Sequence, residues 1–422
     1  MSGDHVRTVT RFAGLRAGGP GIVAPQHVSW IQSQVRGRRR YAVLREDVKL
    51  ISVDDHIVEP PNVWVDRLPA RFQEAGPRIV DQPGHTQAWQ FEGELHKLNL
   101  LGSPQTRVFR TDGTGEDLYA RHYDDMVPGA YDPAARVVAM DEDGVWASIN
   151  FPTFPRFGGT RFLAAKDKEL ASACVVAWND WLIDEWCGTA PKRFVPMTLI
   201  QLWDPELAAA EIRRCAAKGS RAVAMIESPS PLGLPSFWSE YWNPVFAAAQ
   251  ETGLVLCMHV GTSGTLPTPA PESAANSDAV PISLCGLNSM MSLADLTFSG
   301  LLHRFPGVRI ALSEGGSGWV PYLLERMDYT WARTRIGVDR SISPSDIFRR
   351  NFWTCFISDR HAIESRHSIG LDKLMWESDY PHNDSEWPNS RKFLAEAVAD
   401  VPDEEVRQIA ETNARNLFNF WD

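Results

Sequence analysis

The stretch LISVDDH, from Leu50 to His56, opens the regular part of the chain and shows the pattern on which the fold depends. A mostly apolar run of strand length comes first, and acidic and imidazole side chains follow at once. Successive side chains of a strand point to opposite faces, so Asp54 and His56 share one face while Asp55 points to the other. A carboxylate beside an imidazole is half of a divalent-metal site.

Similar apolar runs recur to the end of the chain and alternate with helix-length segments. Their nearly continuous apolar character is typical of parallel strands buried on both faces. Eight strands alternating with helices favour a closed (β/α)8 TIM barrel, an α/β fold, over an open doubly wound sheet. The predicted strands are Leu50–Val53, Val145–Phe151, Phe194–Ile200, Ala222–Ile226, Leu254–Val260, Val308–Leu312, Asn351–Ile357 and Leu374–Trp376.

Two segments fall outside this repeat. Residues 1–48, which include the basic run Arg36–Arg40, are predicted to be an N-terminal extension to a barrel that spans 49–422. Residues from about 60 to 132, between the first two strands, are mostly polar and rich in Gly and Pro. We expect them to be an inserted cap over the barrel mouth, because structureless loops of that length are usually functional. A long helix is predicted over 162–186, and another is predicted to begin at Pro205 with Asp204 as its cap.

Composition excludes several classes of partner. A net charge of −11 over 422 residues argues against nucleic acid, because phosphate binding needs a basic face. No run approaches the ~20 apolar residues of a membrane span, so we expect neither a membrane partner nor a secretory signal. Six cysteines without a C-x-x-C pair predict reduced thiols and a cytoplasmic location.

Five tryptophans in predicted loops either pack in the core or between subunits, or line a pocket for an apolar or aromatic substrate: Trp64, Trp89, Trp203, Trp376 and Trp387.

Reactive side chains follow the predicted strands at their carboxyl ends, where barrel enzymes carry their active sites. His259 follows the fifth strand, and Asp379 follows the eighth. Either residue alone is commonly a hydrogen-bonded structural residue or a helix cap. A barrel, however, brings both of them beside Asp54 and His56, where acids and imidazoles need a cation or protons to balance them. The sequence therefore predicts one divalent metal held by Asp54, His56, His259 and Asp379.

At these residues the chain resembles the amidohydrolase superfamily, within it the amidohydrolase-2 branch of aminocarboxymuconate-semialdehyde decarboxylase and the resorcylate decarboxylases. The resemblance covers roughly residues 50–420 and rests on VDDH at 53–56, MHVG at 258–261 and ESDYPH at 377–382. It implies that Asp54, His56, His259 and Asp379 bind the metal, and that Asp379 also exchanges protons with water or substrate. The metal it implies is Zn²⁺ first and Mn²⁺ second, in a homodimer or higher homo-oligomer.

The sixth strand departs from the family pattern. The family motif S-H-G-G is here Ser313-Glu314-Gly315-Gly316. Glu314 is then a proton relay, a metal ligand or a hydrogen-bonding partner. Glu227, after the fourth strand, stands where binuclear relatives carry a bridging residue. We expect it to cap the loop 228–230 instead, which leaves one metal.

The predicted activity is metal-dependent hydrolysis of a small aromatic or apolar substrate that bears a carbonyl or carboxylate. A metal-activated water attacks the substrate, Asp379 carries the proton, and Glu314 and His382 assist. The alternative is non-oxidative decarboxylation, in which Asp379 protonates the carbon that loses CO₂; the missing strand-six histidine tilts the prediction toward hydrolysis. A non-catalytic barrel is a third hypothesis, which the mixed ligand set argues against. Three arginines, otherwise ordinary surface residues, are candidates for binding a substrate carboxylate: Arg107, Arg110 and Arg156.

Overall fold

The computed structural model describes residues 43–98, 121–264, 266–270, 279–334, 337, 339–382 and 384–421. The N-terminal unit Met1–Tyr41 lies outside these residues, as do Arg107 and Arg110. The end of the predicted extension lies inside them, and there Leu44 and Val48 are buried against the barrel.

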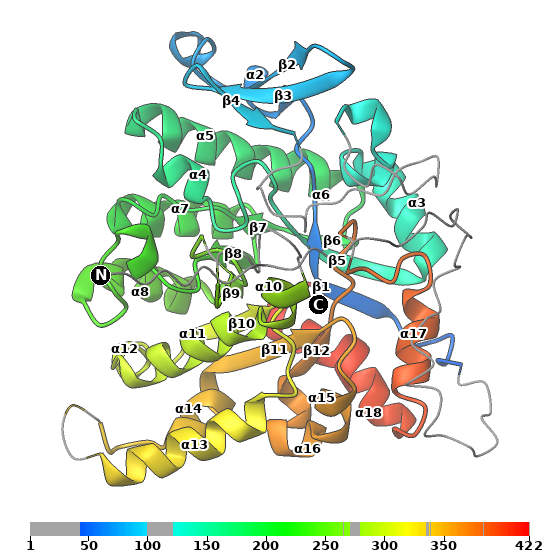
Figure 1. Cartoon of the computed structure of the whole chain (residues 1–422), viewed down its shortest axis with the longest axis vertical. Coiled ribbons are helices and arrows are strands. Elements are labelled where there is room, and N and C mark those ends of the chain that lie inside the picture. The colour runs from blue at the N-terminus through cyan, green and yellow to red at the C-terminus, as the bar shows by residue number, and fades with distance from the viewer. Residues whose placement is uncertain are drawn as a thin grey trace, which may run out of the picture. The chain divides into compact units, whose positions relative to one another are not determined.

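Parallel strands form the centre of the fold, and helices surround them (Figure 1). Every neighbouring pair of barrel strands is parallel, in the order β1-β5-β6 and then β7-β8-β9-β10-β11-β12. Their carboxyl ends therefore open on one face of the barrel. The bounds are β1 Leu50–His56, β5 Val145–Phe151, β6 Phe194–Val195, β7 Met197–Thr198, β8 Ala222–Met225, β9 Val255–His259, β10 Arg309–Ser313, β11 Phe352–Phe356 and β12 Leu374–Trp376.

Two seams close this ring of strands. At one seam, Asp379 N donates to Asp54 O at 2.8 Å and His56 N donates to Tyr380 O at 2.7 Å, which ties the chain after β12 to β1. At the other, β6 continues into β7 across Pro196. The prediction of one unbroken strand over 194–200 is wrong, because proline has no N–H for the ladder and the strand changes partners there. The (β/α)8 barrel is confirmed.

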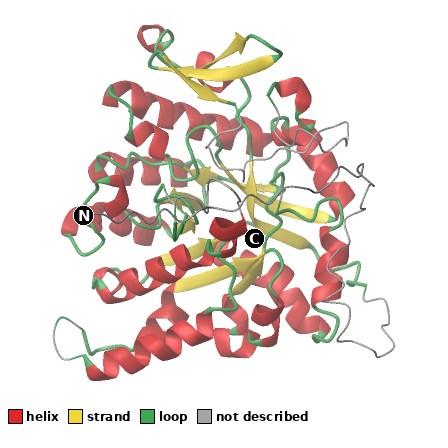
Figure 2. Cartoon of the chain, viewed as in Figure 1, coloured by secondary structure: helices red, strands yellow, loops and turns green. Residues whose placement is uncertain are grey.

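The helices lie around the strands (Figure 2). The predicted single helix over 162–186 is wrong: α4 ends at Leu163, and α5 begins after Asp167, whose carboxylate caps it by accepting from two backbone N–H groups. The predicted cap at Asp204 is confirmed. The main helices are α3 Pro133–Asp143, α4 Thr160–Leu163, α5 Lys168–Trp181, α7 Pro205–Ala217, α8 Asn243–Thr252, α11 Gly286–Phe298, α13 Val320–Arg333, α14 Pro344–Asn351, α17 Ser390–Ala397, α18 Asp403–Arg407 and α19 Asn413–Phe418.

The predicted insertion contains a small sheet that the sequence did not predict. Strands β2 (Arg78–Gln82), β3 (Thr86–Phe91) and β4 (Glu94–Lys97) pair antiparallel, apart from the barrel strands. The Glu92 carboxylate accepts hydrogen bonds from the backbone N–H groups of Lys166 and Asp167, at 2.9 and 2.8 Å. The sheet is therefore tied to the segment that leads from the carboxyl end of β5 into α5.

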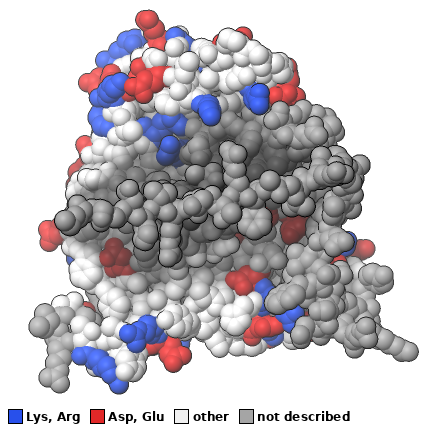
Figure 3. Space-filling view, in the orientation of Figure 1, with Lys and Arg blue, Asp and Glu red and all other residues white. Residues whose placement is uncertain are grey.

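The structure tests several predictions that were based on composition. Trp64, Trp89 and Trp376 are buried in the core, as the packing alternative predicts. All six cysteines are free thiols. Within the described residues, no helix is both long and apolar enough to cross a membrane. On the face shown in Figure 3, the described Lys and Arg side chains are interspersed with Asp and Glu.

Candidate metal centre

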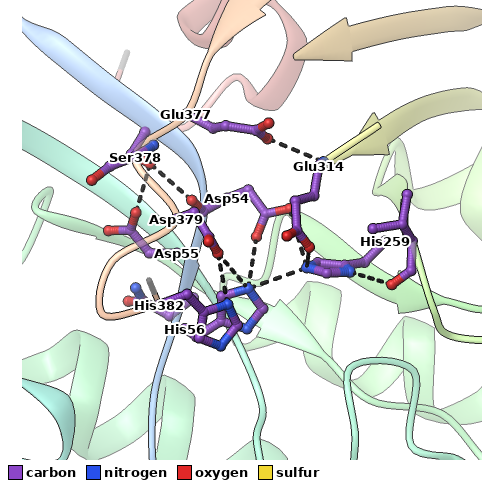
Figure 4. Close-up of polar contacts among 12 residues, drawn as sticks. Asp54, Asp55, His56, His259, Glu314, Glu377, Ser378, Asp379 and His382 are labelled. Atoms are coloured by element: carbon purple, nitrogen blue, oxygen red, sulfur yellow. Dashed lines mark hydrogen bonds and ion pairs between the residues drawn. The ribbon is translucent and has the colours of Figure 1, made fainter. Parts of the chain in front are cut away.

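Six acidic and imidazole side chains converge at the carboxyl ends of β1, β9, β10 and β12 (Figure 4). Asp54 and His56 lie at the carboxyl end of β1 with Asp55 between them. Their side chains point the same way, as their spacing predicts. Asp55 points away, and its carboxylate accepts from Ser52 Oγ at 2.7 Å. We call this group the mouth cluster: Asp54, His56, His259, Glu314, Asp379 and His382.

The mouth cluster is closely spaced. His56 Nε2 lies 3.1 Å from Asp379 Oδ1 and 3.5 Å from Asp54 Oδ1. His259 Nε2 lies 3.6 Å from Asp54 Oδ2 and 3.1 Å from His56 Nε2. Two ligands at about 2.1 Å from one ion stand about 3.0–3.4 Å apart at right or tetrahedral angles, so these separations suit neighbours on a single ion.

The two histidines are held in different ways. His259 Nδ1 lies 2.6 Å from the carbonyl of Val260 and donates to it, which turns Nε2 toward the cluster. In metal-binding histidines, the N–H group of the second ring nitrogen usually donates a hydrogen bond to such an acceptor. His56 Nδ1 has no hydrogen-bond partner among the described residues, and its ring stacks on His382 with centroids 3.8 Å apart. Burial lowers the pKa of His259 and of His382 to about 3, so both rings are neutral at pH 7.

The carboxylates of the cluster lack protein partners to balance them. Both oxygens of Asp54 and both oxygens of Asp379 are buried without a hydrogen bond in the described part of the chain. No Lys or Arg among the described residues forms an ion pair with Asp54, Glu314 or Asp379. Burial, and then the neighbouring carboxyl groups, raise the pKa of all three well above their ordinary values. A divalent cation among these oxygens and imidazoles would remove that imbalance, so the residues fit one divalent metal ion.

Backbone geometry aims two of these side chains. Glu314 directly follows β10 and Asp379 is the third residue after β12, and their φ values are positive, at 58° and 59°. Non-glycine residues adopt this left-handed conformation at a cost, and functional sites often contain it. Glu377 Oε2 accepts from Glu314 N at 3.2 Å and from Cys355 Sγ at 2.6 Å, which fixes the turn after β10.

Sequence reasoning gave no role to three residues that support the cluster. They are Glu377, the aromatic Phe157 in the loop after β5, and Arg136 on α3. The Phe157 ring lies 4.2 Å from the His259 ring and 4.5 Å from the His56 ring, between centroids. The fully buried Arg136 donates to the His56 carbonyl and lies 3.7 Å from Asp55 Oδ2. Only Glu377 carries a signal in the sequence, since it opens the ESDYPH motif.

Comparison with known proteins places this chain in a family. The sequence model described as amidohydrolase matches residues 80–420. The chain belongs to the amidohydrolase family. A gamma-resorcylate decarboxylase from Polaromonas sp. is 24% identical over 305 residues, which cover 67% of this chain and 86% of the relative.

Two solved structures share the fold of this amidohydrolase. An amidohydrolase from Mycobacterium avium subsp. paratuberculosis aligns with a TM-score of 0.70 at 23% identity, over 88% of this chain and 99% of that one. A dihydroxybenzoic acid decarboxylase from Polaromonas sp., with bound manganese and the inhibitor 2-nitroresorcinol, aligns with a TM-score of 0.56 at 18% identity, over 88% and 97% of the two chains.

Glu227 lies outside the mouth cluster of this amidohydrolase. Its Oε1 accepts from Gly261 N at 3.0 Å, from Ser263 Oγ at 2.7 Å and from Asn288 Nδ2 at 2.7 Å. The carboxylate thus fixes the loop after β9 rather than the predicted loop 228–230. Arg156 lies half-buried in the loop after β5 with a positive φ of 63°. Burial lowers its pKa from the ordinary value.

Proposed function

We propose that this amidohydrolase is a metal-dependent, non-oxidative decarboxylase of an aromatic carboxylic acid. The observation that carries the proposal is the pair of buried aspartates, Asp54 and Asp379, whose four carboxylate oxygens have no hydrogen-bond partner among the described residues. They face His56 and His259 in a chain that is similar to gamma-resorcylate decarboxylases over two-thirds of its length. The similarity favours decarboxylation over the hydrolysis predicted from sequence.

Asp54, His56, His259 and Asp379 would hold the ion. When bound, a divalent cation supplies positive charge that polarises a substrate carboxylate and a neighbouring oxygen. We propose Mn²⁺ before the predicted Zn²⁺, because the decarboxylase relative contains manganese. The imidazoles bind as neutral donors, in keeping with the donation from His259 Nδ1 to Val260 O.

Asp379 is the proton carrier of the proposed reaction. The C–C bond to the substrate carboxylate breaks, and its electron pair stays on the ring carbon. That pair takes the proton of the Asp379 carboxyl to form the new C–H bond, and CO₂ leaves. Burial raises the pKa of Asp379 from its ordinary value, which favours proton uptake by the carboxyl oxygen that does not face the ion. His382 Nδ1, 2.9 Å from Asp379 Oδ1, is placed to return the proton to Asp379 afterwards.

Hydrolysis is the second candidate, and one observation favours it. Glu314 replaces the histidine of the family motif, and its Oε2 lies 3.0 Å from His259 Nε2. Its side chain is 14% exposed, whereas those of Asp54 and His259 are fully buried. A carboxylate that solvent reaches beside the cluster can take a proton from an attacking water.

A substrate screen tests the two candidates. Mn²⁺-loaded protein is incubated with hydroxylated benzoic acids, including 2,6-dihydroxybenzoate, and in parallel with aryl esters and amides. We expect CO₂ release from at least one acid, and one deuterium on the product ring in D₂O. Turnover of esters or amides with no CO₂ from any acid would support hydrolysis instead.

A variant pair assigns the proton carrier. Asp379→Asn should lower kcat by about 10²- to 10⁴-fold, the usual contribution of acid–base catalysis. Asp143→Asn is the matched control. Asp143 is a buried aspartate outside the cluster, whose Oδ1 accepts from Ser390 N at 2.7 Å.

A further inference from the structure

Glu314 is held in an unusual conformation that directs its side chain to the mouth cluster (Figure 4). It follows β10 with a φ of 58°. Its N–H donates to Glu377 Oε2 at 3.2 Å, and its carbonyl accepts from Cys285 Sγ at 3.7 Å. A left-handed non-glycine residue persists only where its surroundings enforce it. Here both sides of the peptide are fixed, and the side chain ends with Oε2 3.0 Å from His259 Nε2.

His259 Nε2 faces more partners than one proton can serve. It lies 3.0 Å from Glu314 Oε2, 3.1 Å from His56 Nε2 and 3.6 Å from Asp54 Oδ2. An N–H on this nitrogen could point at only one of the three. The ring already donates from Nδ1 to the Val260 carbonyl, so in the neutral ring Nε2 carries a lone pair. The lone pair of Nε2 faces a carboxylate oxygen and a second imidazole nitrogen. One cation that lies among these atoms stabilises the arrangement, because all of them can then bind it.

We propose that Glu314 is a fifth protein ligand of the metal, which makes the donor set three carboxylates and two imidazoles. The inference rests on the single ion of the proposed function and adds a ligand to it. The separation of 3.0 Å between Glu314 and His259 matches the spacing of the other donors around His56. The family motif has a histidine at this position, so this donor set belongs to this chain's own sequence.

A five-donor set changes which ion fits and what the substrate can reach. Catalytic zinc sites usually have three protein ligands and one open position. Oxygen-rich sites of higher coordination suit Mn²⁺ better. Five protein donors leave one position of a six-coordinate ion for a substrate oxygen. With Glu314 in place, the ion would therefore bind one substrate oxygen directly, and its charge would act on the neighbouring oxygen without a direct bond.

The loss of Glu314 as a ligand is tested by measuring the affinity of the protein for metal rather than its activity. Affinity for Mn²⁺ is determined by competition with a chelator, with the parent, Glu314→Gln and Glu227→Gln compared at one pH. Loss of an outer-shell partner costs about 10- to 100-fold in affinity, so loss of a ligand should weaken Mn²⁺ binding by more than about 100-fold in Glu314→Gln. Glu227→Gln removes another buried carboxylate near the cluster and should change affinity by less than about tenfold.

Counting water on the ion tests the proposal without any substitution. In the Mn²⁺-loaded parent, broadening of the electron paramagnetic resonance signal by ¹⁷O-labelled water reports the number of water molecules on the ion. We expect one. Two or more would overturn the fifth ligand, as would parent-like Mn²⁺ affinity in folded Glu314→Gln. A parent that binds no Mn²⁺ would overturn the proposed function as well, so the two failures are distinguishable.

Discussion

His56 Nε2 and His259 Nε2 lie 3.1 Å apart, although the two residues are 203 positions apart in the chain. At this distance at most one of the two ring nitrogens can carry a proton toward the other. Asp54 adds a carboxylate within 3.5 and 3.6 Å of the two nitrogens. The arrangement is best balanced by a shared cation, and stability should therefore depend on metal.

Removal of the metal should destabilise the fold. Because the ion binds the native state and not the unfolded chain, Mn²⁺ at about 100 times its Kd should add about 2.7 kcal/mol to the free energy of unfolding. Thermal unfolding after dialysis against EDTA, and again after addition of Mn²⁺, measures this gain. His259→Ala should lose it, whereas His361→Ala, an exposed histidine on α15 (Arg360–Glu364), should keep it. A parent Tm that Mn²⁺ leaves unchanged would contradict the prediction.

Arg136 should stabilise the end of β1 through its charge. The guanidinium donates to the His56 and Gly129 carbonyls and is the cation beside the buried Asp55, at 3.7 Å from Oδ2. Arg136→Met leaves Asp55 buried and uncompensated, which should cost about 3–5 kcal/mol in urea unfolding.

A second substitution separates the charge of Arg136 from its packing. Asp55→Asn removes the carboxylate but can still accept from Ser52 Oγ. In the Arg136→Met background, this change should recover part of the lost stability. If the loss in free energy of unfolding in the double variant equals the sum of the losses in the two single variants, the two charges do not interact.

The strand pattern of LISVDDH was sufficient to place Asp54 and His56 on one face and Asp55 on the other. Alternation is a local property, so the sequence carries it directly. Continuous apolar runs gave the barrel for the same reason. The break at Pro196 depends on which neighbour pairs with each half of the strand, and no local pattern reports that.

The sheet of β2, β3 and β4 was missed although its turns carry a signal. Glu92 and Gly93, which form the two-residue turn between β3 and β4, both have positive φ, and so do Gly84 and His85 in the three-residue turn between β2 and β3. The strands between them are short and polar, so the apolar pattern that revealed the barrel is absent here. Glu314 presents a different limit: its approach to His259 depends on a left-handed backbone and on Glu377, neither of which follows from the residue type.

Phe157 should shield the imidazoles by packing. Its ring is 8% exposed and contacts the rings of both His56 and His259. Phe157→Ala should lower the free energy of unfolding by about 3 kcal/mol, the lower end for a buried phenylalanine. Phe157→Leu, which keeps most of the apolar volume, should cost less. Urea unfolding of Mn²⁺-saturated proteins measures both variants, and equal losses would show that packing volume is not what matters.

The pH dependence of stability should include a contribution from Glu227. Burial raises the pKa of its carboxyl from 4.5 to about 7. Between these values the native state binds more protons than the unfolded chain, so the free energy of unfolding falls as pH rises. From about pH 5 to about pH 7 this loss is about 2 kcal/mol.

Glu227→Gln isolates this contribution. The amide oxygen can still accept from Gly261 N and Ser263 Oγ, so the loop after β9 keeps its hydrogen bonds while the titrating group is gone. As the pH rises from about 5 to about 7, the free energy of unfolding of the variant should therefore increase by about 2 kcal/mol relative to that of the parent. Urea unfolding at the two pH values, with Mn²⁺ saturating throughout, measures the difference. A parent and variant whose stabilities change in parallel would mean that Glu227 is already ionised at the lower pH, so that its hydrogen-bond donors outweigh its burial.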